Sequence, residues 1–445
     1  MSIGKNTVLG MLTDAVVFGL GIVVSVILTR SFGPAQRGIY VLLITTNILL
    51  ANISHLSLGT ACRSLLAHGQ YRLGQVHTIV VLLALGLGML CFAVTTSLVA
   101  VVGVTLFAHT PYNYILIALL LIPTTIYQIY WNSMMLGLNR VLVMNQFNLA
   151  LNTGNALLMI VVVGVFHGGI PGFLAVWLIS SVIGSMTALV IGARMDRLAW
   201  PPDPRVLYQL LSFGLRGHGA QIAHQLFLRF DLYVVSALIG TAGVGIYSVA
   251  TALAEKLWIP FNGIYTSSIS KIAELPPRES ALLTAKVTRT AVLLISSAAI
   301  PFALISPWLV PFMYGAAFQP AVLPLLILLV GTLSWAAATV ITNYILGQLG
   351  RPGLLSAIAW AQLGLSIPLY LGLIFWQGIV GAALASTITY ILALISTLWI
   401  FQRNSHLAIR QILVPQRSDL RDYGRVLRRG LVKVPILRRY TRYLP

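Results

Sequence analysis

Six charged side chains lie inside long apolar segments of the chain. They are Asp14, Arg216, Arg229, Asp231, Glu255 and Lys256. If these segments cross a membrane, each charge costs roughly 2.5–3.5 kcal/mol or more at the bilayer centre, so such residues usually line an ion or ligand path. The acids of this set are candidates for coupling to a proton or Na⁺. Its basic residues are candidates for holding an anionic ligand.

One of these segments carries a stripe of polar side chains. The stripe consists of His218, Gln221, Gln225 and Arg229. Their spacing of three or four residues places them on one face of a helix. Arg, His and Gln cannot face lipid, so the stripe is predicted to face a water-filled cavity or another part of the protein. Together with Arg216 and Lys256, it forms our candidate substrate site.

Side-chain amides extend this candidate site into the first half of the chain. Four of them, Asn145, Asn148, Asn152 and Asn155, recur at helical spacing. An amide both donates and accepts hydrogen bonds, which suits the hydroxyl groups of a sugar. We therefore add Asn132, Asn148 and Asn152 to the candidate substrate site. The alternative is that these amides only join neighbouring helices.

The charged residues also have structural interpretations. Arg216 can extend from the end of a helix to lipid headgroups. Arg229 and Asp231 are two residues apart and do not face each other on a helix, so each needs a partner elsewhere. Lys256 is the candidate partner of Asp231.

The remaining acids are open to the same two interpretations. Asp14, Asp231 and Glu255 are our candidates for ion coupling. Alternatively, a neighbouring helix satisfies Asp14, and Glu255 pairs between helices with a basic side chain. No resident cofactor or metal is expected.

The composition requires a membrane protein. Apolar residues make up 58% of the 445 residues and charged residues only 8%, against about 25% charged in soluble domains. The apolar runs are continuous rather than alternating, which excludes a transmembrane β-barrel. The two cysteines, Cys62 and Cys91, lie in apolar surroundings and indicate neither a disulfide framework nor a metal site.

Long charge-free stretches predict the topology. Between Arg72 and Arg140 lie 67 residues without Lys, Arg, Asp or Glu, and between Arg289 and Arg351 lie 61. Each stretch fits two spans and a short turn, so basic residues occur at every second loop, as the positive-inside rule requires. The pattern predicts twelve transmembrane helices with both termini in the cytoplasm. The predicted spans are 8–29, 39–61, 78–106, 112–137, 143–166, 171–193, 208–239, 244–269, 286–306, 320–346, 354–375 and 378–401.

The net charge of +19 follows this topology and does not indicate nucleic-acid binding. Of the 28 Lys and Arg residues, 23 fall on the predicted cytoplasmic side, and 11 belong to the tail at 403–445. Such a tail is expected to bind anionic membrane lipids.

Short phrases recur between the two halves of the chain. Residues 32–40 read FGPAQRGIY and residues 239–247 read IGTAGVGIY, an offset of 207. GGIPG at 168–172 and QGIVG at 377–381 match at an offset of 209, and LGLNR at 136–140 corresponds to LGQLGR at 346–351. Since six spans is an even number, the halves are predicted to share one orientation, as a parallel repeat about a pseudo-two-fold axis.

The repeat predicts an all-α integral membrane transporter. It would consist of an N-terminal lobe of six helices at 1–200, a C-terminal lobe of six helices at 201–402 and the basic cytoplasmic tail at 403–445. Two such lobes can rock about a central site and open it to each side in turn.

Three stretches resemble the polysaccharide-export flippases of the multidrug/oligosaccharidyl-lipid/polysaccharide (MOP) transporter superfamily. They are LTRSFGPAQRGIY at 28–40, SLGTACRSLLA at 57–67, and the segment 211–261 that contains the polar stripe. The resemblance extends over roughly residues 3 to 402. It implies two six-helix lobes arranged as a V around a central cavity.

The resemblance also implies a function. The protein would move an undecaprenyl-diphosphate-linked oligosaccharide from the cytoplasmic to the outer face of the bacterial inner membrane, with Arg216 paired to the diphosphate. Partners implied are this lipid-linked oligosaccharide and the polysaccharide polymerase and export machinery, and the protein is expected to be a monomer. Lipid II flippases of the same superfamily have two more spans and basic residues in span one, where this chain has Asp14.

Two other functions were weighed. A cation-coupled multidrug exporter agrees with the acid in span one, but the arginines of the polar stripe favour an anionic substrate. A membrane polysaccharide polymerase or glycosyltransferase usually needs a large outer loop or an acidic metal-binding motif, and the chain contains no Asp-x-Asp sequence. We therefore expect a transporter and not an enzyme.

Overall fold

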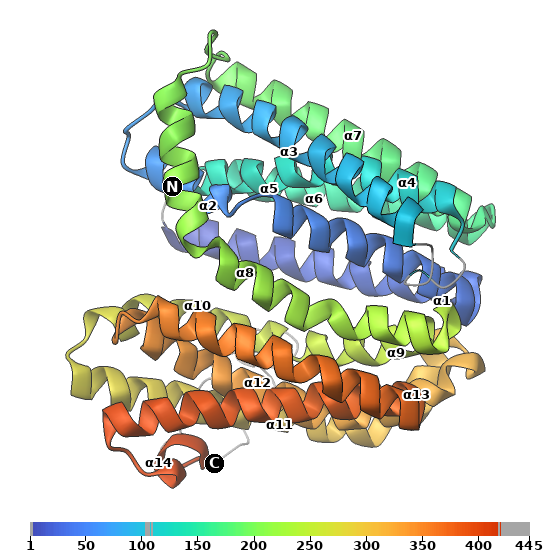
Figure 1. Cartoon of the computed structure of the whole chain (residues 1–445), viewed down its shortest axis with the longest axis vertical. Helices are drawn as coiled ribbons and strands as arrows, with labels where there is room; N and C mark the ends of the chain where they lie inside the picture. Colours follow the sequence, from blue (N-terminus) through green and yellow to red (C-terminus); the bar gives the residue numbers. More distant parts are fainter. Residues whose placement is uncertain (1–2, 103–106, 108–109, 417–418, 420–445) are drawn as a thin grey trace, which may run out of the picture. The chain divides into compact units, whose positions relative to one another are not determined.

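The computed structural model describes residues 3–102, 107, 110–416 and 419. Within these, it leaves undescribed the side chains of residues 3–15, 100–102, 216–217, 259–260, 262–264, 266–267 and 270. All regular structure in the described part of the chain is helical (Figure 1). The expected all-helical membrane fold is thereby confirmed.

The first half of the chain forms eight α-helices and a turn of π-helix. They are α1 (Ile3–Ser54), α2 (Leu58–Ala67), α3 (Leu73–Val102), α4 (Tyr112–Leu120), α5 (Ile122–Gly137), α6 (Val141–Met159), the π-helix η2 (Ile160–Val165), α7 (Gly169–Met195) and α8 (Pro204–Ile239). The second half continues with α9 (Thr241–Lys256), α10 (Ile259–Glu274), α11 (Pro277–Tyr314), the 3₁₀-helix η3 (Ala316–Ala321), α12 (Val322–Gly347), α13 (Pro352–Ser405) and α14 (Ile409–Leu413).

Two of these helices are too long for a single crossing. A straight helix of the 52 residues in α1 would be about 78 Å long, more than twice the thickness of a hydrocarbon core. Gly33 interrupts α1 with φ 65° and ψ −176°, and Gly378 interrupts α13 with φ 61° and ψ −136°. Each helix is therefore two helices joined at a glycine, near the predicted boundaries of spans one and two and of spans eleven and twelve.

Nine helices of the described part are long and apolar enough to cross a membrane, counting α1 and α13 once each. The predicted span 244–269 differs from the structure, because the helix breaks between α9 and α10 just before Pro260. Each of the two helices has only 16 residues, and a span needs about 20. The count of twelve stays a prediction.

The chain forms two compact units. One contains Met1–Val249, Leu309–Ala321 and Ile367–Ala382, and the other contains Ala250–Trp308, Val322–Ser366 and Ala383–Pro445. Helix α8 belongs to the first unit, where it packs against α1 and α2. The lobe boundaries at residues 200 and 402 stay predictions.

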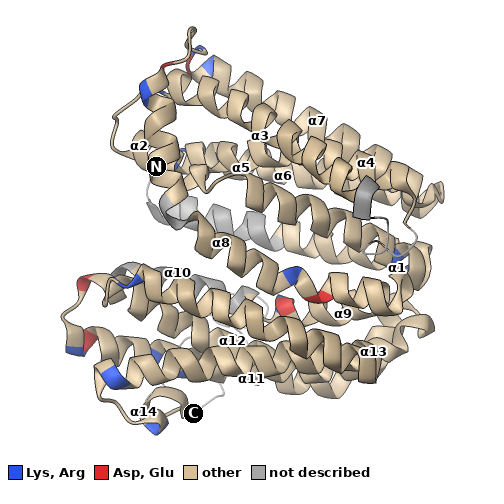
Figure 2. Ribbon diagram, viewed as in Figure 1, with Lys and Arg blue, Asp and Glu red and all other residues tan. Residues whose placement is uncertain are grey.

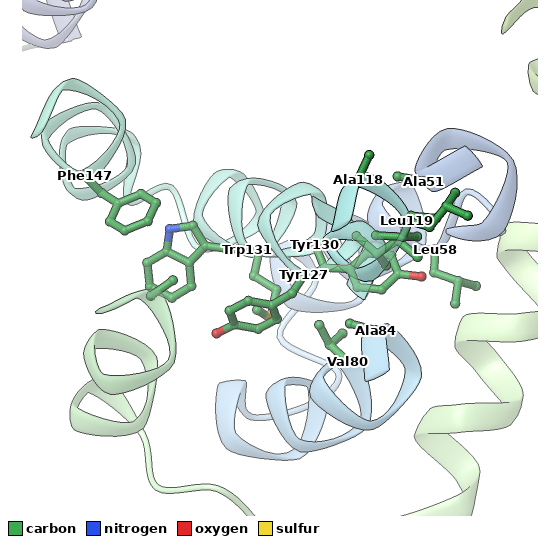
Figure 3. Close-up of a cluster of buried hydrophobic side chains, with 14 of the residues drawn as sticks. Ala51, Leu58, Val80, Ala84, Ala118, Leu119, Tyr127, Tyr130, Trp131 and Phe147 are labelled. Atoms are coloured by element: carbon green, nitrogen blue, oxygen red, sulfur yellow. The ribbon is translucent and has the colours of Figure 1, made fainter. Parts of the chain in front are cut away.

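Aromatic side chains of α5 occupy the centre of the first unit (Figure 3). Tyr130 and Trp131 are completely buried, and Tyr127 nearly so. They pack among small and branched side chains of α1 to α4, such as Ala51 and Val80. These side chains therefore form a closely packed hydrophobic core in this unit.

In the second unit, the beginning of the predicted tail is part of the fold. Residues 403–405 still belong to α13, and α14 follows four residues later. Ile412 of α14 is completely buried in a cluster with Ile341 and Phe401. The described part of the tail is thus anchored to protein at Ile412, although most of its other side chains are exposed.

Candidate functional site

Helix α8 positions half of the candidate residues. Asp203 caps its first turn by accepting a hydrogen bond from the backbone N–H of Arg205, at 2.9 Å. Pro204 occupies the first helical position, where a missing N–H costs nothing. The helix then continues for 36 residues and ends at Gly240, whose φ is 98°. Figure 2 shows that most charges of the described chain lie toward helix ends and turns, with exceptions on α8 and near α9.

The structure gives His218 specific partners. The ring is buried, and its Nε2 lies 2.7 Å from the backbone oxygen of Ile53. Its Nδ1 lies 3.0 Å from the hydroxyl oxygen of Ser57. Both ring nitrogens therefore already have partners at the junction of α1 and α2, and a contact of His218 with substrate stays a prediction.

Three further residues of the stripe follow His218 along α8: Gln221, Gln225 and Arg229. All three are half-buried, and what they face stays a prediction. The side chain of Arg216 lies outside the described residues, as does that of Asp14 on α1. Their roles stay predictions.

Asp231 is buried near the far end of α8. One carboxylate oxygen accepts a hydrogen bond from the Tyr247 hydroxyl at 2.8 Å, and the other accepts one from the backbone N–H of Leu232 at 2.8 Å. Lys256 and Glu255 belong to the other compact unit, so the pairing of Lys256 with Asp231 stays a prediction.

The amides of α5 and α6 come together in the first unit. Asn148 donates to the side-chain oxygen of Asn132 at 3.3 Å. Asn152 is exposed and donates to the backbone oxygen of Asn148 at 2.7 Å. The side-chain oxygen of Asn155 is buried and has no hydrogen-bond partner in the described chain. Part of the stripe thus joins helices, and Asn152 remains accessible.

The sequence interpretation missed Arg37, which it placed in an outer loop. The side chain is only 3% exposed. It donates to the hydroxyl oxygens of Thr29 and of Ser248, the latter at 3.1 Å, and lies 5.6 Å from the ring centre of Tyr314. The sequence did mark this position, because Arg37 lies between Gly33 and Gly38 in the repeated phrase FGPAQRGIY.

The two copies of the repeated phrase touch each other. A Cβ atom on Gly38 would overlap the backbone oxygen of Thr241, and one on Gly245 would overlap that of Pro34. Gly245 follows Gly38 by 207 residues, and Thr241 follows Pro34 by the same 207. Equivalent positions of the two phrases therefore touch each other, and the contact is reciprocal. Gly33 and Gly240, also 207 apart, both have positive φ and ψ near 180°. The predicted pseudo-symmetry is present here in the backbone itself.

A sequence model of the family described as polysaccharide biosynthesis protein matches residues 3–270. The chain belongs to the polysaccharide biosynthesis protein family. The match includes the turn at Gly33, the amides of α5 and α6, and all of α8. A search of curated proteins found no match.

Solved structures show that this family member has the fold of MOP superfamily transporters. An inward-facing multidrug resistance MATE family transporter is 16% identical, with a TM-score of 0.72 over 86% of this chain and 94% of its own. The lipid II flippase MurJ, in an inward closed conformation, is 15% identical, with a TM-score of 0.69 over 90% of both chains.

A third similar structure is a MOP superfamily transporter from Pyrococcus furiosus, whose binding pocket is described as having reversed polarity. It is 13% identical, with a TM-score of 0.60 over 90% of this chain and 94% of its own. At these identities the comparison establishes the fold. The family member is thus a multi-pass membrane protein, as its composition requires.

Proposed function

We propose that this protein is a flippase for undecaprenyl-diphosphate-linked oligosaccharides. It would carry them from the cytoplasmic to the outer face of the bacterial inner membrane, and both of its termini would lie in the cytoplasm. The observation that carries the proposal is the arginine-bearing polar stripe on α8, in a chain of the polysaccharide biosynthesis protein family with a MOP transporter fold.

The substrate has two chemically different parts, and the chain offers a match for each. The diphosphate needs cations, for which Arg216 and Arg229 of α8 are the candidates. The sugar needs groups that both donate and accept, for which Gln221, Gln225 and the accessible Asn152 are suited. The polyprenyl tail is apolar and would stay in the lipid.

Transport by this route needs the central site to open to each side in turn. The reciprocal contact between Gly38 and Gly245 joins α1, just after its break at Gly33, to the start of α9. It is a contact of backbone against backbone, and the hydrogen bond from Arg37 to the Ser248 hydroxyl joins the same two helices beside it. We assign it to the outer closure of the transport path.

Coupling to a proton or Na⁺, through Asp14, Asp231 or Glu255, is part of the proposal. So are anionic lipids and the polysaccharide polymerase and export machinery as partners of a monomeric protein. None of the steps breaks a covalent bond, so the protein would act as a carrier and not as an enzyme.

The test uses Arg216→Ala in a cell that depends on this protein for surface polysaccharide. We expect surface polysaccharide to be lost, with lipid-linked units accumulating on the inner leaflet, while the variant remains present in the membrane. Arg205→Ala is the control, because Arg205 is exposed at the start of the same helix. Normal export by Arg216→Ala would remove this residue from the mechanism.

The second candidate function is cation-coupled multidrug export. It is favoured by the similarity to a multidrug resistance MATE family transporter and by Asp14 in the first span. The two functions differ in cargo. Loss of drug resistance with normal surface polysaccharide in cells lacking the protein would establish the second.

A further inference from the structure

Two consecutive residues in the left-handed conformation separate α1 from α2. Leu56 has φ 51° and Ser57 has φ 55°, a region that side chains with a Cβ atom avoid. The backbone N–H of Ser57 closes this turn by donating to Nδ1 of His55 at 2.7 Å. The turn therefore requires that Nδ1 of His55 carries no proton.

A second imidazole lies on the same turn. Nε2 of His218 faces the carbonyl oxygen of Ile53 and must be the protonated nitrogen, since a carbonyl only accepts. In the neutral ring, Nδ1 then accepts the hydrogen of the Ser57 hydroxyl. The two imidazole rings lie 6.1 Å apart, centre to centre, and both side chains are buried.

The two histidines respond differently to a proton. A proton on Nδ1 of His218 is accommodated, because the Ser57 hydroxyl can turn and accept instead of donating. A proton on Nδ1 of His55 places two donors opposite each other, and the bond that closes the turn is lost.

Helix α8 is in direct contact with this turn. A Cβ atom at Gly214 would lie 2.6 Å from the backbone oxygen of Leu56, so no side chain separates the helix from the turn. The stripe residues Gln221, Gln225 and Arg229 follow on the same helix. A change in the turn is thus transmitted to the element that carries the candidate substrate residues.

His55 directly follows the candidate membrane span Val16–Ser54, at the end of α1. The predicted topology puts this end of the span toward the cytoplasm, where protons are available from water.

The titratable groups around His55 come from each neighbouring helix. In the described part of the chain they are His218 from α8, Tyr130 from α5, whose hydroxyl donates to the His55 backbone oxygen at 2.8 Å, and Cys62 from α2 beside Tyr130. None of these is a carboxylate that would hold a proton permanently on His55.

We propose that His55, Ser57 and His218 form a proton-binding site that couples protonation to the position of α8. In the neutral state His55 closes the turn and α8 is held against it. When Nδ1 of His55 carries a proton, the turn opens and α8 is released. The inference rests on the proposed function in so far as α8 carries the substrate residues.

The test measures amide hydrogen exchange of the full chain in lipid nanodiscs without substrate, at pH 8 and pH 5.5, corrected for intrinsic exchange rates. In the wild type we expect protection of residues 53–60 to fall about three- to tenfold at the lower pH, the effect of losing one hydrogen bond. His55→Asn should show no such fall, because the Asn side-chain oxygen occupies the place of Nδ1 and accepts at either pH.

The matched control is His77→Gln. His77 is buried in the same unit, and its Nε2 lies 2.8 Å from the Tyr127 hydroxyl, but it contacts neither the turn nor α8. This variant should keep the wild-type response. The proposal would be overturned if protection of residues 53–60 in the wild type did not change with pH. It would also be overturned if His55→Asn showed the same change as the wild type.

If His55→Asn does not fold, the pH dependence of exchange protection in the wild type alone tests the proposal. Protection of residues 53–60 and of residues 214–221 must then change with one common midpoint of pH, and separate midpoints would reject the coupling. This readout needs no substrate. It can therefore fail while Arg216→Ala still blocks export, and the reverse holds as well.

Discussion

Buried arginines in this protein are stabilised in two different ways. Arg289 donates from Nε to a carboxylate oxygen of Asp419 at 2.6 Å, and both side chains are buried. Arg37 is equally buried, but its partners in the described residues are two hydroxyl oxygens and an aromatic ring. The first arrangement neutralises the charge. The second leaves a net positive charge on Arg37, close to the break of α1 at Gly33.

The Arg289–Asp419 pair predicts how acid affects the attachment of the tail. Burial raises the pKa of Asp419, but its hydrogen bonds with Arg289 and the Gln416 backbone, together with the nearby positive charges, outweigh this and lower the pKa below its ordinary value of 3.8. A lowered pKa means that the pair stabilises the fold above about pH 3.8, and that this stability is lost as pH falls through the folded-state pKa.

Asp419→Asn should therefore lower the free energy of unfolding at pH 7 by about 1.5–3 kcal/mol, the cost of a lost charged hydrogen bond. The difference from wild type should shrink below pH 3.8, as measured by thermal unfolding in detergent. The control is Asp196→Asn, whose partner Arg72 is 82% exposed, since exposed pairs contribute little. Equal effects of both variants would contradict the prediction.

At the level of helices, the reciprocal glycine contact is the feature that joins the repeated phrases. Glycine is required because the backbone of each turn lies against the other, and neither turn has room for a methyl group. The break inside α1 and the start of α9 are thereby held together by backbone contact, and Arg37 adds a hydrogen bond to Ser248 of α9. Arg30 adds to this by donating to the last backbone carbonyls of α11, at Phe312 and Met313.

Gly38→Ala and Gly245→Ala should both weaken this contact, and by similar amounts because the contact is reciprocal. Overpacking of this kind costs about 1–3 kcal/mol, measured as a lower midpoint of thermal unfolding. Gly219→Ala is the control, since a Cβ atom there would meet nothing within 4 Å on the surface of α8. It should leave the midpoint unchanged or raise it. A large loss in only one of the two turn variants would contradict the reciprocal contact.

For the molecule as a whole, the distribution of charge predicts the orientation in the membrane. Basic residues gather at alternate connections, which places both termini on the cytoplasmic side. The connection at Tyr112 would then face outward and the one at His68 inward, and both side chains are exposed.

Single cysteines test this orientation once Cys62 and Cys91 have been replaced by serine. A membrane-impermeant maleimide should label Tyr112→Cys in cells with an intact inner membrane, and should label His68→Cys only after that membrane is permeabilised. The opposite pattern would reverse the predicted topology.

Composition and charge spacing alone were sufficient for the helical membrane fold, because each span must be apolar over its whole length whatever surrounds it. The repeat at Gly33 and Gly240 could also be read directly, since a turn with positive φ restricts the residue type wherever it occurs. The count of spans was less secure, because whether a break such as that between α9 and α10 ends a span depends on packing.

Only the tertiary structure decided which polar residues have partners. The sequence placed His218 on a stripe with Gln221, but it could not reveal that Ser57 and the backbone oxygen of Ile53 lie beside its two ring nitrogens. Nor could it distinguish Arg37, buried among neutral groups, from an exposed arginine of a loop. Helical spacing determines which way a side chain points, whereas its partner comes from a segment more than a hundred residues away.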